Sequence, residues 1–157
     1  MATYRVRPAT LDDLDILVHQ RIAMFTDMGS LLDDAMLRAK FADWLREHLP
    51  GGTYRAWLVE TAEGAVAAGG GATIIPWPPG PRYPGTSLAF VYNVYTEHAH
   101  RRRGLARLVM DAIHAWCREH DVTSVALNAS TDGRPLYEAM GYVVTPTPMM
   151  FFSLDGV

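Results

Sequence analysis

Cysteine is nearly absent from this chain, and so are long apolar runs and a large net charge. The single cysteine, Cys117, excludes an internal disulfide and a metal site built from several cysteines. No apolar stretch reaches the roughly 20 residues that a membrane-spanning helix needs. A net charge of -3 with 49% hydrophobic residues excludes a disordered chain and argues against a dedicated nucleic-acid binder. Because the first residues lack the apolar core of a signal peptide, we expect one cytoplasmic domain over residues 1–157.

Hydrophobic periodicity and turn residues divide the first half of the chain. They predict a strand at 4–7, helices from Leu11 to Gly29 and from Asp33 or Asp34 to Pro50, and strands at 54–60 and 65–75. The short connection through Gly64 is typical of an antiparallel hairpin. Three glycines at 69–71 predict a bulge or a close approach of ligand or backbone, with a poorly packed strand end as the alternative.

The second half alternates between strands and helices. The proline-rich stretch 76–85 cannot be regular structure. After it we predict strands at 87–95 and 124–127, helices at 104–120 and 134–140, and last strands at Tyr142–Val144 and Met149–Phe152. The fold class is therefore α/β (α+β), with a mixed, mostly antiparallel sheet of six to seven strands and about four helices.

The turn at 98–107 breaks two helix rules at once. Three consecutive arginines, Arg101 to Arg103, stand where the macrodipole already places positive charge at a helix start. Gly104 in the first turn costs nearly 1 kcal/mol relative to alanine. An anionic ligand would resolve both conflicts, because free N–H groups and arginines bind phosphates. The alternative is a solvated basic turn.

These residues make the chain similar to the GNAT superfamily of acyl-CoA-dependent N-acyltransferases. Arg101-Arg102-Arg103-Gly104-Leu105-Ala106 satisfies the family's pyrophosphate signature, Q/R-x-x-G-x-G/A. About 30 residues later, the run from Leu136 to Tyr142 resembles its second motif, L-Y-x-x-x-G-[FY]. The opening from Arg5 to Leu14 also resembles a GNAT start, so the resemblance covers nearly the whole chain.

The resemblance implies a GNAT fold and acetyl-CoA as co-substrate. It places Val94, Tyr95 and Thr96 along the pantetheine arm, where the central strand separates from the next one. The pyrophosphate would lie on the turn formed by Arg101, Arg102, Arg103, Gly104, Leu105, Ala106 and Arg107. Asn128 falls where members often contact the cofactor, although a strand-end asparagine also commonly satisfies a turn.

Two residues are candidates for catalysis. Tyr137 matches the family's usual general acid, which protonates the departing thiolate; the alternative is a core tyrosine with its hydroxyl bonded to backbone. Glu97, just past the central strand, is a candidate base, alone or through water, or else a surface carboxylate. We expect no metal, because the His98–His100 pair lacks a third ligand nearby.

The acceptor is expected to be a primary amine, either a small molecule or a peptide. Tyr92, Asn93 and Ser130 are further polar candidates for the acceptor region. The acids Asp27, Asp33, Asp34 and Asp43 could draw a cationic acceptor, although solvated surface is the commoner fate of such charges. The apolar 149–152 strand suggests a homodimer. Two alternatives stay open: a non-catalytic acyl-CoA-binding sensor or partner module, and a nucleic-acid module using Arg101 to Arg103.

Overall fold

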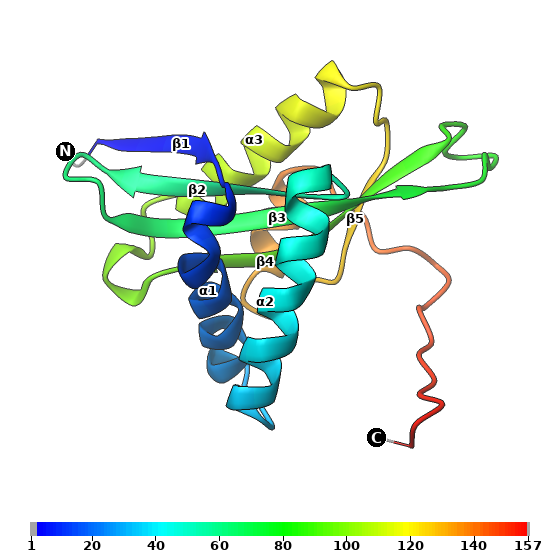
Figure 1. The fold of residues 1–157 in the computed structure, drawn as a ribbon. Helices are drawn as coiled ribbons and strands as arrows, with labels where there is room; N and C mark the ends of the chain where they lie inside the picture. Colours follow the sequence, from blue (N-terminus) through cyan, green and yellow to red (C-terminus); the bar gives the residue numbers. More distant parts are fainter. Residues whose placement is uncertain (1–2, 157) are drawn as a thin grey trace.

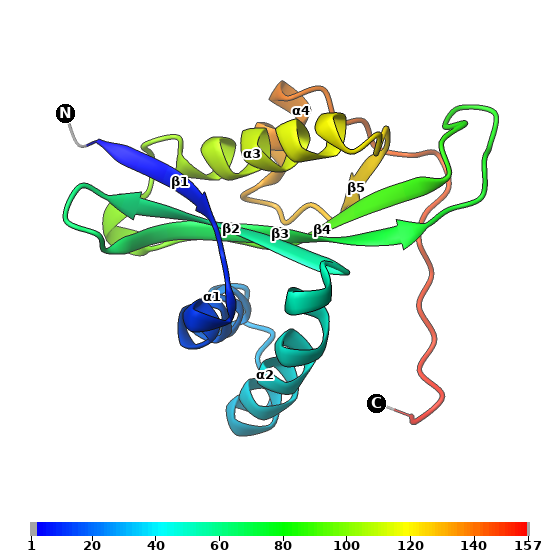
Figure 2. The same ribbon diagram turned by 45° about the horizontal axis from the view of Figure 1, so that its top comes forward.

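The computed structural model describes residues 3–156 and consists of one five-stranded sheet between two layers of helices (Figures 1 and 2). The strands are β1 (Tyr4–Pro8), β2 (Tyr54–Thr61), β3 (Val66–Pro76), β4 (Ser87–Thr96) and β5 (Val125–Leu127). The helices are α1 (Leu14–Asp27), α2 (Asp34–Gly51), α3 (Leu105–Glu119) and α4 (Arg134–Ala139), with short 3-10 turns at Leu11–Asp13 and His98–His100. The predicted α/β class and the four helices are confirmed.

The strands lie in the order β1-β2-β3-β4-β5, and the sheet is mixed. The first three pairings are antiparallel, whereas β4 and β5 are parallel. Helices α1 and α2 cover one face, and α3 and α4 cover the other (Figure 2). Each face has its own apolar core, centred on Leu45 and Leu58 beneath α1 and α2, and on Val109 and Ile113 beneath α3.

Local signals fix the ends of the helices. The Asp33 side chain accepts a hydrogen bond from the Met36 N–H at 2.9 Å, which begins α2, and Gly52 ends it with a φ of 76°. In the 3-10 turn Leu11–Asp13 that leads into α1, Thr10 and Asp13 form the predicted capping box. None of the helices in the described part of the chain is long and apolar enough to cross a membrane.

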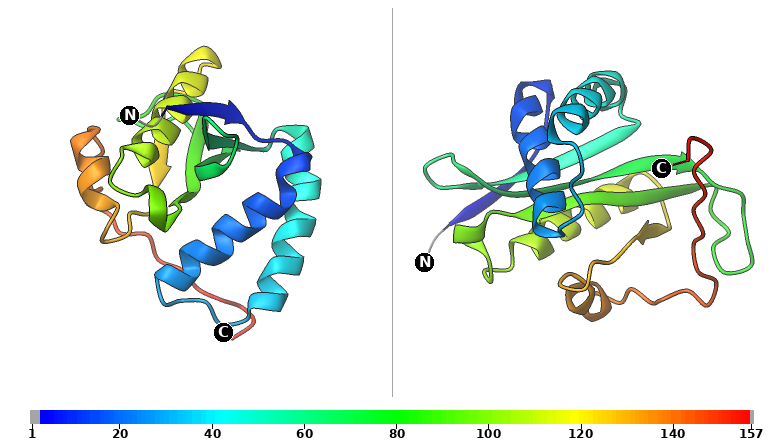
Figure 3. Two further views of the ribbon diagram at one scale, coloured as in Figure 1. Left: turned by 90° about the vertical axis from the view of Figure 1, so that its left-hand side faces the viewer. Right: turned by 90° about the horizontal axis from the view of Figure 1, so that it is seen from below.

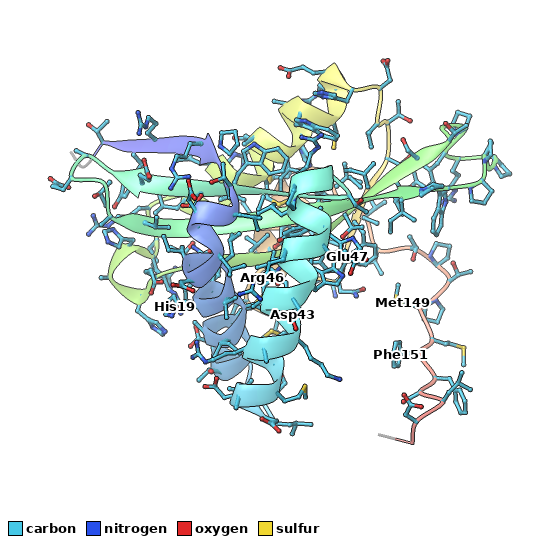
Figure 4. All side chains as sticks on the ribbon, in the orientation of Figure 1. His19, Asp43, Arg46, Glu47, Met149 and Phe151 are labelled. Carbon is cyan, nitrogen blue, oxygen red and sulfur yellow. The ribbon has the colours of Figure 1, made fainter. Side chains whose placement is uncertain are left out.

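The prediction of six to seven strands is wrong, because residues 142–144 and 149–152 form no strand. Pro146 and Pro148 lack the N–H donors that a ladder needs, and the segment finds no partner strand among residues 3–156. It leaves the domain as an extended arm (Figure 3), and the Met149 and Phe151 side chains project from it (Figure 4). These two side chains are 68% and 91% exposed.

A bulge interrupts the centre of the sheet. Tyr92 pairs with Gly71 and Tyr95 with Gly69, so Asn93 and Val94 lie opposite one residue of β3. Asn93 adopts a φ of 63°, which is uncommon outside glycine. The predicted bulge is therefore confirmed, and the extra residue of the irregularity belongs to β4. As a result, Tyr92 and Asn93 both contact residues beneath α1 and α2.

Candidate functional site

The second half of β4 has a free edge. Its parallel pairing with β5 covers only three positions and ends at Val91 opposite Leu127. From Tyr92 to Thr96 the strand pairs with β3 alone, and the ribbon views show β4 and β5 moving apart (Figures 2 and 3). The predicted cofactor residues Val94, Tyr95 and Thr96 lie on this part of the strand. An extended chain with its own amides can add to such an edge.

The turn between β4 and α3 presents unbonded backbone amides. Arg102 and Gly104 have positive φ values of 60° and 76°. The first hydrogen bond into α3 runs from the Leu108 N–H to the Gly104 carbonyl at 3.2 Å. The backbone amides of residues 102–107 donate no hydrogen bond to any group within residues 3–156. Free amides at the start of a 15-residue helix are typical of anion-binding sites, and the anion site expected at this turn stays a prediction.

The arginines of this turn have different surroundings. Arg101 donates to the Thr96 carbonyl at 2.9 Å and to Asp27 at 2.5 Å, which ties the turn to the end of α1. The hydrogen bond from Arg101 lowers the pKa of the Asp27 carboxyl. Arg103 donates to the Tyr4 hydroxyl at 3.1 Å. Arg102 and Arg107 are exposed and form no ion pair in the described structure, so their guanidinium groups are the available ones.

Tyr137 lies in α4 and is only 9% exposed within the core under α3. Its ring packs edge-on against Tyr142 at 5.8 Å, and Gly133 leaves room for it, since a Cβ there would come within 3.0 Å of the ring. Burial raises the pKa of the Tyr137 hydroxyl. This hydroxyl makes no hydrogen bond within residues 3–156, so the alternative of a core tyrosine tied to backbone lacks its defining contact.

Glu97 is held by two neighbours on the α1 side. Its Oε1 lies 2.7 Å from His19 Nε2, and its Oε2 accepts from the Tyr95 hydroxyl at 3.4 Å. His19 projects from α1 (Figure 4). On the opposite side of β4, Asn128 is exposed directly after β5, and the Ser130 Oγ accepts from the Gly133 N–H at 3.1 Å, which positions α4. Ser130 does not line the cavity described next.

A cavity of about 360 Å³ opens between α1, α2 and the bulge of β4. Helix α2 contributes Leu37, Lys40, Phe41 and Trp44, and the sheet contributes Thr73, Tyr92 and Asn93. Arg21 of α1 completes the lining and also borders a second cavity of about 210 Å³ at the α1–α2 connection. Sequence reasoning identified Tyr92 and Asn93 but missed Arg21. Arg21 lies at helical spacing between Val18 and Phe25 on the apolar face of α1, and this was the available signal.

A hydrogen-bonded chain connects this cavity to the sheet. Arg21 Nη1 donates to Asn93 Oδ1 at 2.5 Å, and Asn93 Nδ2 donates to the Tyr54 hydroxyl at 2.9 Å. Tyr54 is fully buried, which raises its pKa to about 12. Gly71 is required beside it, because a Cβ there would overlap the Tyr54 hydroxyl and come within 2.6 Å of the Arg55 carbonyl. The bulge is thus fixed by contacts from three other elements.

The acids that the sequence offered for a cationic acceptor are otherwise engaged. Asp27 pairs with Arg101 and His98, and Asp33 caps α2. Asp34 and Asp43 form ion pairs with arginines one turn further along α2. None of the four lines the cavity beside β4. The expectation that they would attract the acceptor is not supported by this arrangement.

Known proteins resemble this chain in sequence and in structure. The model of the acetyltransferase (GNAT) family matches residues 20–142. A GCN5-related N-acetyltransferase from Ralstonia eutropha JMP134 is 34% identical, with a TM-score of 0.86 and 98% of this chain and 100% of that chain covered. A predicted acetyltransferase with acetyl-CoA from Clostridium acetobutylicum is 22% identical, with a TM-score of 0.86 and 98% of each chain covered. A comparison with curated proteins found no match.

Proposed function

This chain belongs to the GNAT family of acetyltransferases, and we propose that it moves an acetyl group from acetyl-CoA to a primary amine by direct attack in a ternary complex. One observation carries the proposal: β4 combines three features in sequence. Its bulge residue Asn93 lines a cavity, its following residues up to Thr96 have a free edge, and the turn after it holds unbonded amides. These are the features that an acceptor, a pantetheine arm and a pyrophosphate need.

The residues present fit acetyl-CoA. We propose that the free edge at Val94, Tyr95 and Thr96 pairs with the pantetheine arm, and that the amides of residues 102–107 bind the pyrophosphate. The exposed Arg102 and Arg107 supply positive charge there, while Arg101 and Arg103 stabilise the shape of the turn through Asp27 and Tyr4. Asn128 stays a proposed polar contact from the end of β5.

The proposed reaction forms a carbon–nitrogen bond and breaks the carbon–sulfur bond of the thioester. The neutral amine attacks the acetyl carbonyl, and the thiolate leaves with the bonding electron pair. Tyr137 gives its proton to the thiolate. Two features of its hydroxyl favour this role: burial keeps it protonated, and it makes no hydrogen bond to any neighbour among residues 3–156. The attacking nitrogen becomes an ammonium centre, and Glu97, paired with His19, takes one proton from it directly or through water, while solvent returns a proton to Tyr137. Both protons and electrons then balance.

Thermal unfolding with and without acetyl-CoA tests the binding half of the proposal. A ligand at about 100 times its Kd adds about 2.7 kcal/mol to the free energy of unfolding. We expect a rise in Tm with acetyl-CoA that ATP and an unrelated polyanion do not match. Arg102→Gln should reduce this rise, and Arg82→Gln, a matched change of an exposed arginine in the proline-rich loop, should not. An equal shift with every polyanion would reduce the turn to a nonspecific anion site.

Thiol release in the presence of an amine panel tests the chemical half. A specific Tm shift without release from any amine would favour the alternative, a non-catalytic acyl-CoA-binding module. Binding of nucleic acid only at very low salt would mark that interaction as nonspecific. We also propose a cytoplasmic location, which cell fractionation tests.

We further propose that the extended C-terminal arm pairs with a second copy of this chain. Residues 149–152 are four consecutive exposed apolar residues, and the outer edge of β5 has no partner strand within residues 3–156. Pairing between copies would cover both. We expect a dimer in sedimentation velocity at micromolar concentration and a monomer after removal of residues 149–157. A monomer of the full chain would contradict this proposal.

A further inference from the structure

The guanidinium of Arg21 is a partly buried cation without a carboxylate partner. Among residues 3–156 its only hydrogen bond goes to the neutral amide of Asn93, and its Nε is buried without any acceptor. The rings of Phe25 and Phe41 flank it, each 4.9 Å from Cζ. Burial lowers the pKa of this guanidinium, which still stays charged at neutral pH. Such a cation is costly to bury unless an anion accompanies it.

A structural arginine in the same molecule shows the difference. Arg7 donates twice to Asp13 at 2.8 Å and once to Glu60 at 2.6 Å, so its charge is compensated inside the domain. Arg21 has no equivalent partner, and its one hydrogen bond leads through Asn93 to the Tyr54 hydroxyl. The compensation for Arg21 must therefore come from outside residues 3–156 or from water.

The charge and chemistry of the cavity indicate which ligand provides it. Arg21 and Lys40 both line the cavity, and no acidic residue does. Lys40 is the only lysine of the chain and forms no ion pair in the described part. The Thr73 Oγ1 is buried without a hydrogen-bond partner and lines the same cavity. Its remaining walls include the aromatic side chains of Phe41 and Trp44.

We propose that the acceptor is a small amine that also bears a carboxylate, with Arg21 as its carboxylate-binding residue and Lys40 as a second positive charge. This inference rests on the proposed acetyl transfer. A guanidinium fork matches a carboxylate geometrically, and the aromatic walls suit an apolar or aromatic portion between amine and carboxylate. Because Arg21 contacts the bulge residue Asn93, a carboxylate held there leaves the amine beside β4. A cavity of about 360 Å³ is of the size that small ligands occupy.

Matched pairs of acceptors test this inference. Each pair is an amino acid with an apolar or aromatic side chain and the amine formed by removing its carboxylate, assayed by thiol release at saturating acetyl-CoA. We expect kcat/KM to be ten- to a hundredfold higher for the carboxylated member, as is typical for a hydrogen bond to a charged group. Arg21→Gln should bring this ratio close to one, mostly through KM. The control Arg38→Gln alters an exposed arginine of α2 that lines neither cavity and should preserve the ratio.

A second measurement does not depend on turnover. Because Lys40 is the only lysine, an amine-reactive reagent labels it at a unique internal position, which mass spectrometry reads directly. The carboxylated amines should protect Lys40, and their decarboxylated counterparts should not. If Arg21→Gln fails to fold, the substrate pairs and the protection assay on the unaltered protein still decide. Equal kcat/KM values within every pair would overturn the inference but leave acetyl transfer intact, whereas no thiol release from any amine would overturn the proposed function itself.

Discussion

Replacing Tyr137 by phenylalanine separates catalysis from stability. The change removes only a hydroxyl that has no hydrogen-bond partner within residues 3–156, and it keeps the ring that packs on Tyr142. We therefore expect the free energy of unfolding to change by less than about 0.5 kcal/mol. If the hydroxyl protonates the thiolate, kcat should fall by about 100- to 10,000-fold, which corresponds to about 3–5 kcal/mol in the activation barrier.

Tyr142→Phe is the matched control, because the same atom is removed from the neighbouring ring. The Tyr142 hydroxyl lies 2.6 Å from His114 Nε2, so its loss should cost about 0.5–1.5 kcal/mol of stability. For a domain of this size that lowers Tm by about 1–6 °C. We expect kcat to stay within a few-fold of the unaltered protein. In an acetyl-CoA thiol-release assay Tyr137→Phe should lose activity and Tyr142→Phe should keep it. In a melting curve Tyr137→Phe should keep its Tm and Tyr142→Phe should show a lower one.

The pH dependence adds an independent readout. Burial raises the pKa of Tyr137, so the proton-donating form persists to higher pH than that of an exposed tyrosine, whose pKa is about 10. We expect no fall in kcat between pH 7 and about 9.5 from loss of this proton. An unchanged kcat in Tyr137→Phe would refute the assignment of the general acid. A large loss of stability in that variant would instead reveal a structural hydrogen bond.

Two further changes test the scaffold. Gly71→Ala should lower the free energy of unfolding by about 2–4 kcal/mol in chemical denaturation, because the added Cβ displaces the buried Tyr54 and weakens its hydrogen bond to Asn93. The control Gly51→Ala, whose Cβ would meet nothing within 4 Å, should leave stability unchanged or raise it slightly. The hydrogen bonds from Arg7 lower the pKa of Asp13, so the stabilisation that they give is present above the ordinary pKa near 4 and is lost as the pH falls through the pKa of the folded state. Replacing Asp13 by Asn should cost about 1.5–3 kcal/mol of stability at pH 7, and the variant should lose less stability on acidification than the unaltered protein. Equal pH profiles for the two proteins would contradict this.

The sequence predicted elements that depend on local signals. The amphipathic α3 and its start at Gly104, the capping box at Thr10 and the hairpin through Gly64 all depend on residues within one or two turns of each other. The last strands were predicted wrongly because Met149–Phe152 has strand-like composition, but a strand also needs a partner, and partner choice is a tertiary property.

In the candidate site, too, the features with local sequence signals could be predicted and those that depend on tertiary contacts could not. The turn at 101–107 was predicted because its arginines and Gly104 conflict with helix preferences locally. That Arg101 is bound to Asp27, 74 residues away in the chain, has no local signal. Arg21 does interrupt an apolar helix face visibly, but a lone arginine on such a face is ordinarily paired inside the domain. Only the three-dimensional structure shows that it has no acidic partner within residues 3–156.

The cavity beside β4 has two walls that differ in how they are attached. The wall formed by Arg21 and Asn93 is connected through Tyr54 to the interior of the sheet, so a change there disturbs β4, the strand proposed to bind acetyl-CoA. The facing wall is a single stripe of α2, in which Leu37, Lys40, Phe41 and Trp44 follow helical spacing. Under the proposed acetyl transfer, evolution or laboratory selection can therefore alter acceptor choice through this one helix, at positions such as Leu37 and Lys40, without rebuilding the strand. Relatives that share the strand but differ in this stripe should then differ in acceptor while keeping the same acyl donor.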